Sequence, residues 1–281
     1  MKRILVPTDF SECATYALEL ACDIALKNEA KLLLLHTVGH PFGGGIDPTG
    51  ASVFQAFDDD LLDTLLTRGR AKMAEALANI SVSADKITQL VEIGHPSDMI
   101  LDKIKEFSID LVVMGTNGTS GIQEFLAGSN AEKVVRKASC PVITLKSSVK
   151  LEDIKTIAFA SDFGQFNEQA MASLKQMQHL LGASIDFVRI NTPNNFQRDA
   201  LTIKQMDGLV KQEMFLKSAL HVYNDFSEEE GLMNFAEDMK SDMIGMITHG
   251  RTGLNHILSG SMAEDVVNHT NLPVWTMRIS E

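Results

Sequence analysis

The sequence predicts an α/β fold with two similar domains, each built around a parallel sheet. Short apolar runs alternate with amphipathic helical stretches, the same order of elements occurs twice, and one 32-residue segment is repeated. The chain of 281 residues fits two domains of about 140 residues, which is a common domain size. Strand–helix alternation of this kind implies βαβ units with right-handed crossovers.

The first half begins with an Ile/Leu/Val-rich strand over 3–8, followed by a helix over 11–28 that Ser11 can cap. The run KLLLLHTV over 31–38 is almost continuously apolar, which is typical of a strand covered on both faces. The loop over 39–60 is long enough to be either functional or disordered. The remaining elements expected here are a helix over 59–79, a strand over 86–93, a helix over 97–107 capped by Ser97, a strand over 109–114, a helix over 129–138 and a strand over 141–146.

The second half repeats this order after a hinge at 147–152, so we expect domains over 1–147 and 152–281. Its strands are expected at 154–161, 183–190, 218–224, 241–248 and 273–278, and its helices at 165–181, 198–214, 228–239 and 262–270.

The repeated segment runs from Gly115 to Lys146 and again from Ile247 to Arg278, an offset of 247 − 115 = 132 residues without a gap. Thirteen of the 32 aligned positions are identical, which indicates an internal duplication. The identical pairs include Gly118/Gly250, Gly128/Gly260, Ser129/Ser261, Glu132/Glu264 and Pro141/Pro273.

The frame Gly115-x2-Gly118-x9-Gly128-Ser129 has the form of a phosphate site. Glycines expose peptide N–H groups without a Cβ in the way, and the first N–H groups of the helix that follows lack intrahelical partners at the positive end of the helix dipole. A second interpretation remains open, because Ser129-x-x-Glu132 and Ser261-x-x-Glu264 both match a capping box that merely starts a helix.

Asp9 follows the first strand in VPTDFS, and its counterpart Asp162 follows the matching strand in FASDFG. A carboxylate at this place can accept hydrogen bonds from ribose hydroxyls, as in other nucleotide-binding folds. The alternative is an acidic cap or first-turn residue that interacts with the helix dipole.

Taken together, ILVPTDFS, DLVVMGTNG, the glycine frame and CPVITLK resemble the universal stress protein family, and the chain resembles a tandem member. The resemblance covers nearly the whole chain, and the glycine frame is similar to that of the family's ATP-binding branch. It implies that each domain is doubly wound, with a five-stranded parallel sheet in the order 3-2-1-4-5 and helices on both faces. Strands one and four then meet at the topological switch point where ligands bind.

The resemblance also implies the roles of single residues. Pro7, Thr8 and Asp9 would line an adenosine pocket, and the backbone near Val38 would meet the adenine edge. Met114 and Gly115 would flank the ribose and α-phosphate. The phosphates would be held by Gly118, Gly128, Ser129 and Asn130.

The second half departs from this pattern, since Ile247 replaces the first glycine and Ala160 replaces Pro7. A branched Cβ at position 247 would crowd a close backbone approach. We therefore expect one good nucleotide site in the first half and a weaker, degenerate one in the second. The residues that remain for the second site are Asp162, Gly250, Gly260 and Ser261.

The bulk composition excludes several classes of partner. The net charge of −12 disfavours nucleic acids and anionic membrane surfaces, and no apolar run reaches the roughly 18 residues of a membrane span. Three cysteines without paired spacing indicate reduced thiols, and MKRILVPTDF lacks the apolar region of a signal peptide. A cytoplasmic protein is expected. His36 and His40 straddle a strand end and a loop, so no metal site is expected from them.

The expected function is a regulatory stress protein that binds ATP, with AMP or ADP as other adenine nucleotides that would fit and with Mg²⁺ left open. Two alternatives stay open: a slow ATP hydrolase or adenylyl-transfer enzyme, and a nucleotide-free assembly or interaction protein. The sequence contains neither a P-loop nor a local set of residues for nucleophilic catalysis, so no motif favours the enzyme alternative. The resemblance implies that the two domains pair within one chain through PVITLK and PVWTMR, while association of two chains is left open.

Overall fold

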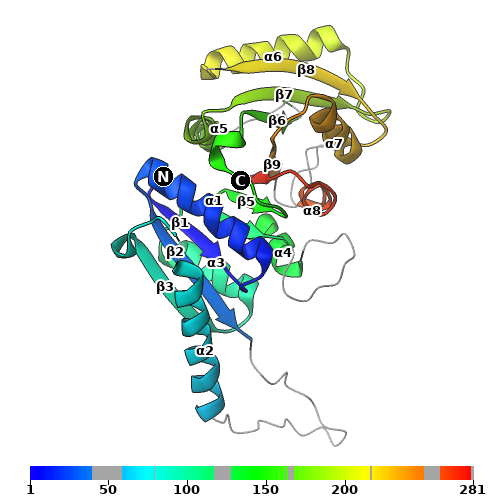
Figure 1. The fold of residues 1–281 in the computed structure, drawn as a ribbon. Coiled ribbons are helices and arrows are strands. Elements are labelled where there is room, and N and C mark those ends of the chain that lie inside the picture. Colours follow the sequence, from blue (N-terminus) through cyan, green and yellow to red (C-terminus); the bar gives the residue numbers. More distant parts are fainter. Residues whose placement is uncertain are drawn as a thin grey trace, which may run out of the picture.

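The computed structural model describes residues 1–39, 59–78, 80–116, 128–161, 163, 168–215, 217–249 and 260–279. One ten-stranded sheet runs through these residues in the order β3-β2-β1-β4-β5-β10-β9-β6-β7-β8. The N-terminal half supplies one side of this sheet and the C-terminal half the other, with β5 and β10 at the centre (Figure 1).

The five strands of the N-terminal half lie in the order β3-β2-β1-β4-β5 and pair in parallel throughout, as predicted. Its elements are β1 (Arg3–Pro7), α1 (Glu12–Asn28), β2 (Lys31–Val38), α2 (Asp59–Leu77), η1 (Ala84–Lys86), β3 (Ile87–Ile93), α3 (Pro96–Glu106), β4 (Leu111–Gly115), α4 (Ser129–Lys137) and β5 (Val142–Leu145).

The C-terminal half repeats the same strand order, β8-β7-β6-β9-β10, again with parallel pairs. Its elements are η2 (Leu151–Asp153), β6 (Thr156–Ala160), α5 (Glu168–Leu181), β7 (Ser184–Asn191), α6 (Asp199–Glu213), β8 (Ser218–Asn224), α7 (Glu228–Asp238), β9 (Met243–His249), α8 (Gly260–His269) and β10 (Val274–Ile279). The predicted order of elements is confirmed in both halves.

The two halves join where β5 and β10 pair in antiparallel fashion, with Ile143 opposite Trp275. Trp275 is 1% exposed and is among the largest fully buried side chains. The predicted pairing through PVITLK and PVWTMR is therefore present, and it turns two five-stranded sheets into one.

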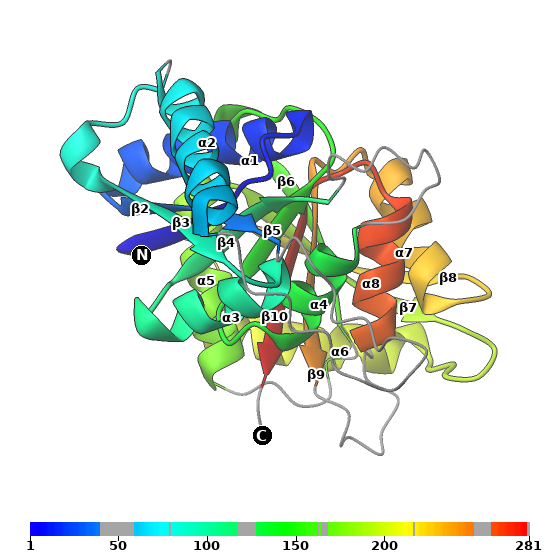
Figure 2. The same cartoon turned by 90° about the horizontal axis from the view of Figure 1, so that it is seen from below.

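Helices cover both faces of the sheet, which explains the near-continuous apolar strands (Figure 2). One core cluster contains side chains of α1, α2, α5 and α6, and the other contains side chains of α3, α4, α7 and α8. Along β1, Ile4 and Val6 belong to the first cluster and Leu5 to the second, as the two-residue period of a strand requires.

One predicted cap is wrong. Ser97 was expected to cap α3, but His95 is the N-cap residue and Pro96 takes the first helical position. Proline fits there because its fixed φ suits a helix and its missing N–H would have no intrahelical partner. Ser97 is fully buried inside the first turn instead.

The linker between the halves is bound to the first helix of the N-terminal half. The amide of Leu151 donates to Asp23 Oδ2 over 3.4 Å, and Lys27 Nζ donates to the carbonyl of Leu181 at the end of α5 over 3.4 Å. Among the described helices, none is long and apolar enough to cross a membrane.

Candidate functional site

A cavity of about 350 Å³ opens in the N-terminal half at the carboxyl ends of β1 and β4. The crossovers from these neighbouring strands leave on opposite faces, so this is the topological switch point of the half sheet. The cavity is lined by Pro7, Thr8, Asp9, Ser11, Ala14, Leu35, Thr37, Pro96, Ile100, Met114, Gly115, Thr116, Gly128, Ser129, Asn130 and Ala131.

The turn after β1 presents Thr8 and Asp9 to the cavity through a series of local hydrogen bonds. The amide of Phe10 donates to Thr8 Oγ1 over 3.0 Å, and the amide of Ser11 donates to Asp9 Oδ1 over 3.0 Å. Ser11 then caps α1 by accepting from the amide of Ala14, as predicted. Asp9 is thus not the helix cap, and its carboxylate is fixed against the backbone at the cavity wall.

Gly115 ends β4 beside the first turn of α1. A Cβ added at this position would lie 2.7 Å from the backbone carbonyl carbon of Cys13, a distance that real Cβ contacts do not reach. The reason for this glycine therefore differs from the one expected from the sequence: its bare Cα admits the α1 backbone, which brings Ser11 and Ala14 to the cavity.

The start of α4 leaves peptide donors at the cavity. Gly128 is the N-cap residue, and no side chain caps the helix. The Gly128 carbonyl accepts from the amides of Ala131 and Glu132. Within the described parts of the chain, no group accepts from the amides of Ser129 and Asn130. These donors lie at the positive end of the helix dipole, where an anion is stabilised.

The capping-box interpretation does not hold for this helix. Ser129 is the first helical residue rather than the cap, so its side chain is not in the capping position. Glu132 Oε1 instead accepts from Asn268 Nδ2 of α8 over 3.2 Å. The acidic residue of the pattern thus serves the contact between the two halves.

Two polar side-chain atoms in this cavity are buried and unpartnered among the described residues: Thr116 Oγ1 and Asn130 Oδ1. Thr116 is 3% exposed, and its backbone is held in place because its amide donates to Leu145 and its carbonyl accepts from Gly128 over 2.6 Å. A buried polar atom without a hydrogen bond is costly, so these two atoms are available to a partner that enters the cavity, such as water or a ligand.

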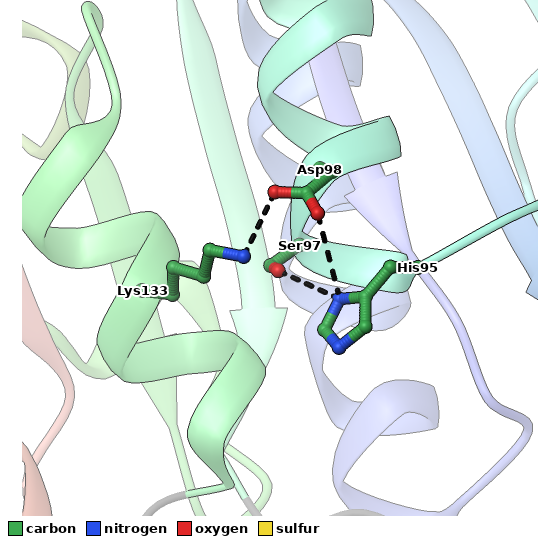
Figure 3. A network of polar contacts seen from close by, with 4 residues as sticks. All are labelled: His95, Ser97, Asp98 and Lys133. Carbon is green, nitrogen blue, oxygen red and sulfur yellow. Dashed lines mark hydrogen bonds and ion pairs between the residues drawn. The ribbon is translucent and has the colours of Figure 1, made fainter. Parts of the chain in front are cut away.

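The far wall of the cavity is fastened by a polar network between α3 and α4 (Figure 3). Asp98 Oδ1 lies 2.8 Å from Lys133 Nζ, and His95 Nδ1 lies 3.0 Å from Ser97 Oγ and 4.0 Å from Asp98 Oδ2. The hydrogen bond from Lys133 lowers the pKa of the Asp98 carboxyl. This network joins the helix of Pro96 and Ile100 to the helix that carries the free amides.

The lining combines apolar side chains with uncharged polar groups. Asp9 is its one acidic residue, and none of the described lining residues is a lysine or arginine. An anion in this cavity would therefore be held by peptide amides and hydroxyls. The described residues also contain no group of three or more His, Cys, Asp or Glu side chains arranged to hold a metal ion.

None of the three cysteines, all of which lie in the described residues, forms a disulfide. Burial raises the pKa of the Cys22 thiol to about 11 and that of the Cys140 thiol to about 12. Neither therefore provides a thiolate at neutral pH.

Eight of the ten residues predicted for the first site line this cavity: Pro7, Thr8, Asp9, Met114, Gly115, Gly128, Ser129 and Asn130. Val38 is not among the lining residues, since β2 contributes Leu35 and Thr37 instead. Gly118 lies outside the described residues.

Several lining residues were not predicted from the sequence, including Thr116, Leu35 and Thr37 of β2, and Pro96 and Ile100 of α3. Thr116 follows Gly115 directly, so the position inside the glycine frame was the available signal. Leu35 and Thr37 could have been found from the two-residue period of β2.

In the second half, Asp162 and Gly250 lie outside the described residues, whereas Gly260 and Ser261 form the start of α8. Ile247, the counterpart of Gly115, is 3% exposed and belongs to the core cluster that contains Met171 of α5. A side chain therefore fills the position at which the first half brings helix and strand backbones together.

Comparison with known proteins shows the family to which this chain belongs. The model of the "Universal stress protein family" matches residues 1–146 and 216–278, which is more than half of the chain. The chain belongs to the universal stress protein family. The predicted family is therefore confirmed.

Individual universal stress proteins are similar over one half or over both. Universal stress protein A homolog 2 of Coxiella burnetii is 30% identical over 128 residues, which are 46% of this chain and 82% of the relative. Universal stress protein Slr1230 of Synechocystis is 23% identical over 292 residues, covering 99% of this chain and all of the relative. The crystal structure of a universal stress protein from Archaeoglobus fulgidus covers 98% of both chains with a TM-score of 0.72 and 18% identity, which supports the two-domain fold.

Proposed function

We propose that this universal stress protein binds one adenine nucleotide, ATP in the first instance, in the cavity of its N-terminal half. The observation that carries the proposal is the pair of buried atoms Thr116 Oγ1 and Asn130 Oδ1, which have no hydrogen-bond partner in the part of the chain that the structure describes. They share one cavity with the free amides of α4 and with the Asp9 carboxylate. This set offers donors for phosphate and an acceptor for sugar hydroxyls.

The cavity fits such a ligand in kind and in size. A volume of about 350 Å³ is within the range of about 300–1,000 Å³ that small-molecule sites occupy. The amides of Ser129 and Asn130 would bind phosphate oxygens, and Asp9 would accept from the ribose. Leu35, Ile100 and Met114 supply the apolar surface that a nucleoside needs.

We assign the site to binding rather than to turnover. The described lining contains no lysine, arginine or histidine that could stabilise a transferring phosphoryl group or activate a nucleophile. Nucleotide occupancy would then act by regulating the protein's conformation or partners, in keeping with the stress-response role of the family. Mg²⁺, if it accompanies the phosphates, would be bound mainly by the nucleotide and water.

The second half is proposed to be degenerate. Ile247 and Ala160 replace Gly115 and Pro7, both of which line the first cavity. The residues of the weaker site, Gly260 and Ser261 together with Asp162 and Gly250, would bind nucleotide less tightly or not at all. Three cysteines without a disulfide among the described residues support a reducing compartment, so we propose the cytoplasm as the location.

Thr116→Val tests the proposal because it keeps the side-chain volume and removes the unpartnered hydroxyl. Without ligand, the variant should unfold at the same temperature as the wild type or slightly above it, since a buried unsatisfied group costs about 1–3 kcal/mol. With ATP, its thermal shift should be smaller than that of the wild type. Thr248→Val is the matched control at the equivalent buried position of the second half and should leave the ATP shift unchanged.

The wild-type protein decides between the functional classes. Mass spectrometry of small molecules released from the purified chain should detect an adenine nucleotide, and ATP should raise the unfolding temperature. Neither bound nucleotide nor any thermal shift would contradict the proposal and favour an interaction protein. Turnover of ATP that is lost on Gly128 or Asp9 substitution would favour an enzyme.

A further inference from the structure

We propose that His36 is a positioning residue for the Asp9 turn, acting from behind the cavity through the carbonyl of Thr8. The inference rests on the proposed nucleotide site, because its consequence is an effect on how Asp9 meets the sugar. His36 itself is not among the cavity-lining residues, although its neighbours Leu35 and Thr37 are. The two-residue period of β2 therefore directs its ring to the opposite face of the sheet.

The ring of His36 makes one defined hydrogen bond there. Its Nδ1 lies 2.9 Å from the carbonyl oxygen of Thr8. A carbonyl can only accept, so Nδ1 carries the proton and the imidazole donates. The preceding strand residue holds the N–H of the same residue, because the amide of Thr8 donates to the carbonyl of Leu35 over 2.8 Å. Strand β2 thus fixes both the N–H and the C=O of Thr8.

Phe10, two positions after Thr8, explains why this support is needed. Phe10 has φ of 65°, the left-handed region that residues with a side chain rarely adopt. The Phe10 ring lies against the His36 ring, with centroids 4.4 Å apart. The Nζ atom of Lys72 in α2 lies 5.5 Å from the centroid of the Phe10 ring. The residue with this disfavoured backbone therefore packs its ring against His36 in a tilted contact.

Helix α2 packs closely against His36 at Gly69. A Cβ added at Gly69 would lie 3.0 Å from His36 Cδ2, so the glycine lets the helix pack directly on the imidazole. A glycine inside a helix lowers helix propensity, and here it makes room for this ring. Asp9 stands between Thr8 and Phe10, and His36 contacts both of these neighbours.

The second half keeps the turn and has an arginine at the position of the histidine. Phe163 has φ of 57°, and its amide donates to Ser161 Oγ over 3.1 Å, as Phe10 does to Thr8. The register of β6 with β7 and of β1 with β2 places Arg189 at the position of His36. Arg189 Nη2 donates to the carbonyl of Asn195 over 3.3 Å, which lies in the connection after β7. The histidine contact thus accompanies the half in which we propose the working site.

The experiment compares variants of the full chain by isothermal titration with ATP and with inorganic tripolyphosphate, which has no sugar. His36→Leu removes the donor and keeps an apolar surface for Phe10, whereas His36→Asn keeps an amide donor near the place of Nδ1. His221→Leu, a half-buried strand histidine of the second half, is the matched control. Circular dichroism and thermal unfolding check that each variant is folded.

We expect His36→Leu to weaken ATP binding by about tenfold, the size of one good hydrogen bond, with tripolyphosphate affinity changed by less than about twofold. His36→Asn should recover most of the ATP affinity, and His221→Leu should leave it unchanged. In an Asp9→Ala background, His36→Leu should add little, because residues that act through one another are not additive.

Three results would overturn the inference: ATP affinity unchanged in His36→Leu, equal losses for ATP and tripolyphosphate, or full additivity with Asp9→Ala. A His36→Asn variant as weak as His36→Leu would also count against it. Failure of the proposed function is seen separately, in a wild-type chain that binds no ATP at all, and it would remove the basis of the inference as well.

Discussion

The two halves of this chain share one fold. They differ in how the first helix of each half packs against the fourth strand. In the N-terminal half, Gly115 lets the backbone of α1 approach β4, and a cavity opens at the strand ends. In the C-terminal half, Ile247 fills the equivalent position with a buried side chain. The two halves therefore share the signals that specify the fold, and they differ at the position where β4 and β9 approach the first helix of each half.

The halves also meet each other with approximate two-fold symmetry. Glu132 of α4 accepts from Asn268 of α8, and Glu264 of α8 lies 3.2 Å from Arg136 of α4. Glu132 and Glu264 are aligned in the repeat, as are Arg136 and Asn268. The contact is thus self-complementary, like the interface of a symmetric dimer placed within one chain. The two helices that begin at the glycine–serine steps are in contact through it.

The largest effect on ATP binding is expected from adding a side chain at Gly115, the position at which the halves differ. Gly115→Ala should force α1 away from β4, because its Cβ would lie 2.7 Å from backbone. We expect a loss of stability of about 1–3 kcal/mol or more, together with loss of ATP binding. Thermal unfolding and titration calorimetry measure the two effects.

Ile247→Ala is the counterpart of that change in the second half. It should cost about 2–5 kcal/mol of stability through the cavity it leaves in the core, with ATP affinity unchanged in the folded protein. Equal losses of ATP binding in both variants would mean that the halves do not differ as described.

The next largest difference in ATP binding is expected between substitutions of the two glycines at the starts of α4 and α8. Gly128→Val places a branched side chain beside the Thr116 carbonyl, since a Cβ at this position already lies 3.1 Å from that oxygen. We expect ATP affinity to fall by at least about tenfold, the equivalent of one lost charge-assisted hydrogen bond. Gly260→Val should have far less effect on ATP binding. Comparable losses in a titration of the two variants would contradict the one-site account.

A smaller effect is expected at the contact between α4 and α8. Arg136→Met removes the partner of Glu264 from a half-exposed ion pair, which should change stability by less than about 1 kcal/mol. Chemical denaturation measures this difference, and the number of ATP molecules bound per chain should stay the same. A change in that number would show that the contact between the halves controls the second site.

The smallest effect concerns the network on the α3 wall. Lys133 lowers the pKa of Asp98 in the folded chain, so the bridge stabilises the protein above the ordinary carboxyl pKa and loses its effect as the pH falls through the lowered one. Asp98→Asn should therefore unfold slightly more easily than the wild type at neutral pH, with the difference vanishing below about pH 4. A difference that grows in acid would show that Asp98 has another role.

Much of the fold could be predicted from the sequence because its signals are local. Apolar runs such as KLLLLHTV and caps such as Ser11 fixed the elements to within a few residues. The cap of α3 was misplaced because a proline at the first helical position moves the cap to His95, whatever the preference for serine.

The parts of the site that lie at strand ends and helix starts could be predicted from the sequence. The side chains brought to the site by strand phase and packing were harder to predict. The glycine frame and Asp9 located the cavity, since strand ends and helix starts follow from the order of elements. Which side chains of β2 line the cavity depends on strand phase, so Leu35 and Thr37 were not predicted, and the expected backbone contact near Val38 stays a prediction. The contact of His36 with Thr8 depends on how strands one and two are registered, which no local pattern specifies.

The number of ATP molecules bound per chain tests the central claim most directly. A calorimetric titration of the wild-type protein should give one site per chain, and Gly128→Val should abolish it while Gly260→Val leaves it in place. Two sites of equal affinity, or a single site that survives Gly128→Val and disappears with Gly260→Val, would contradict the account.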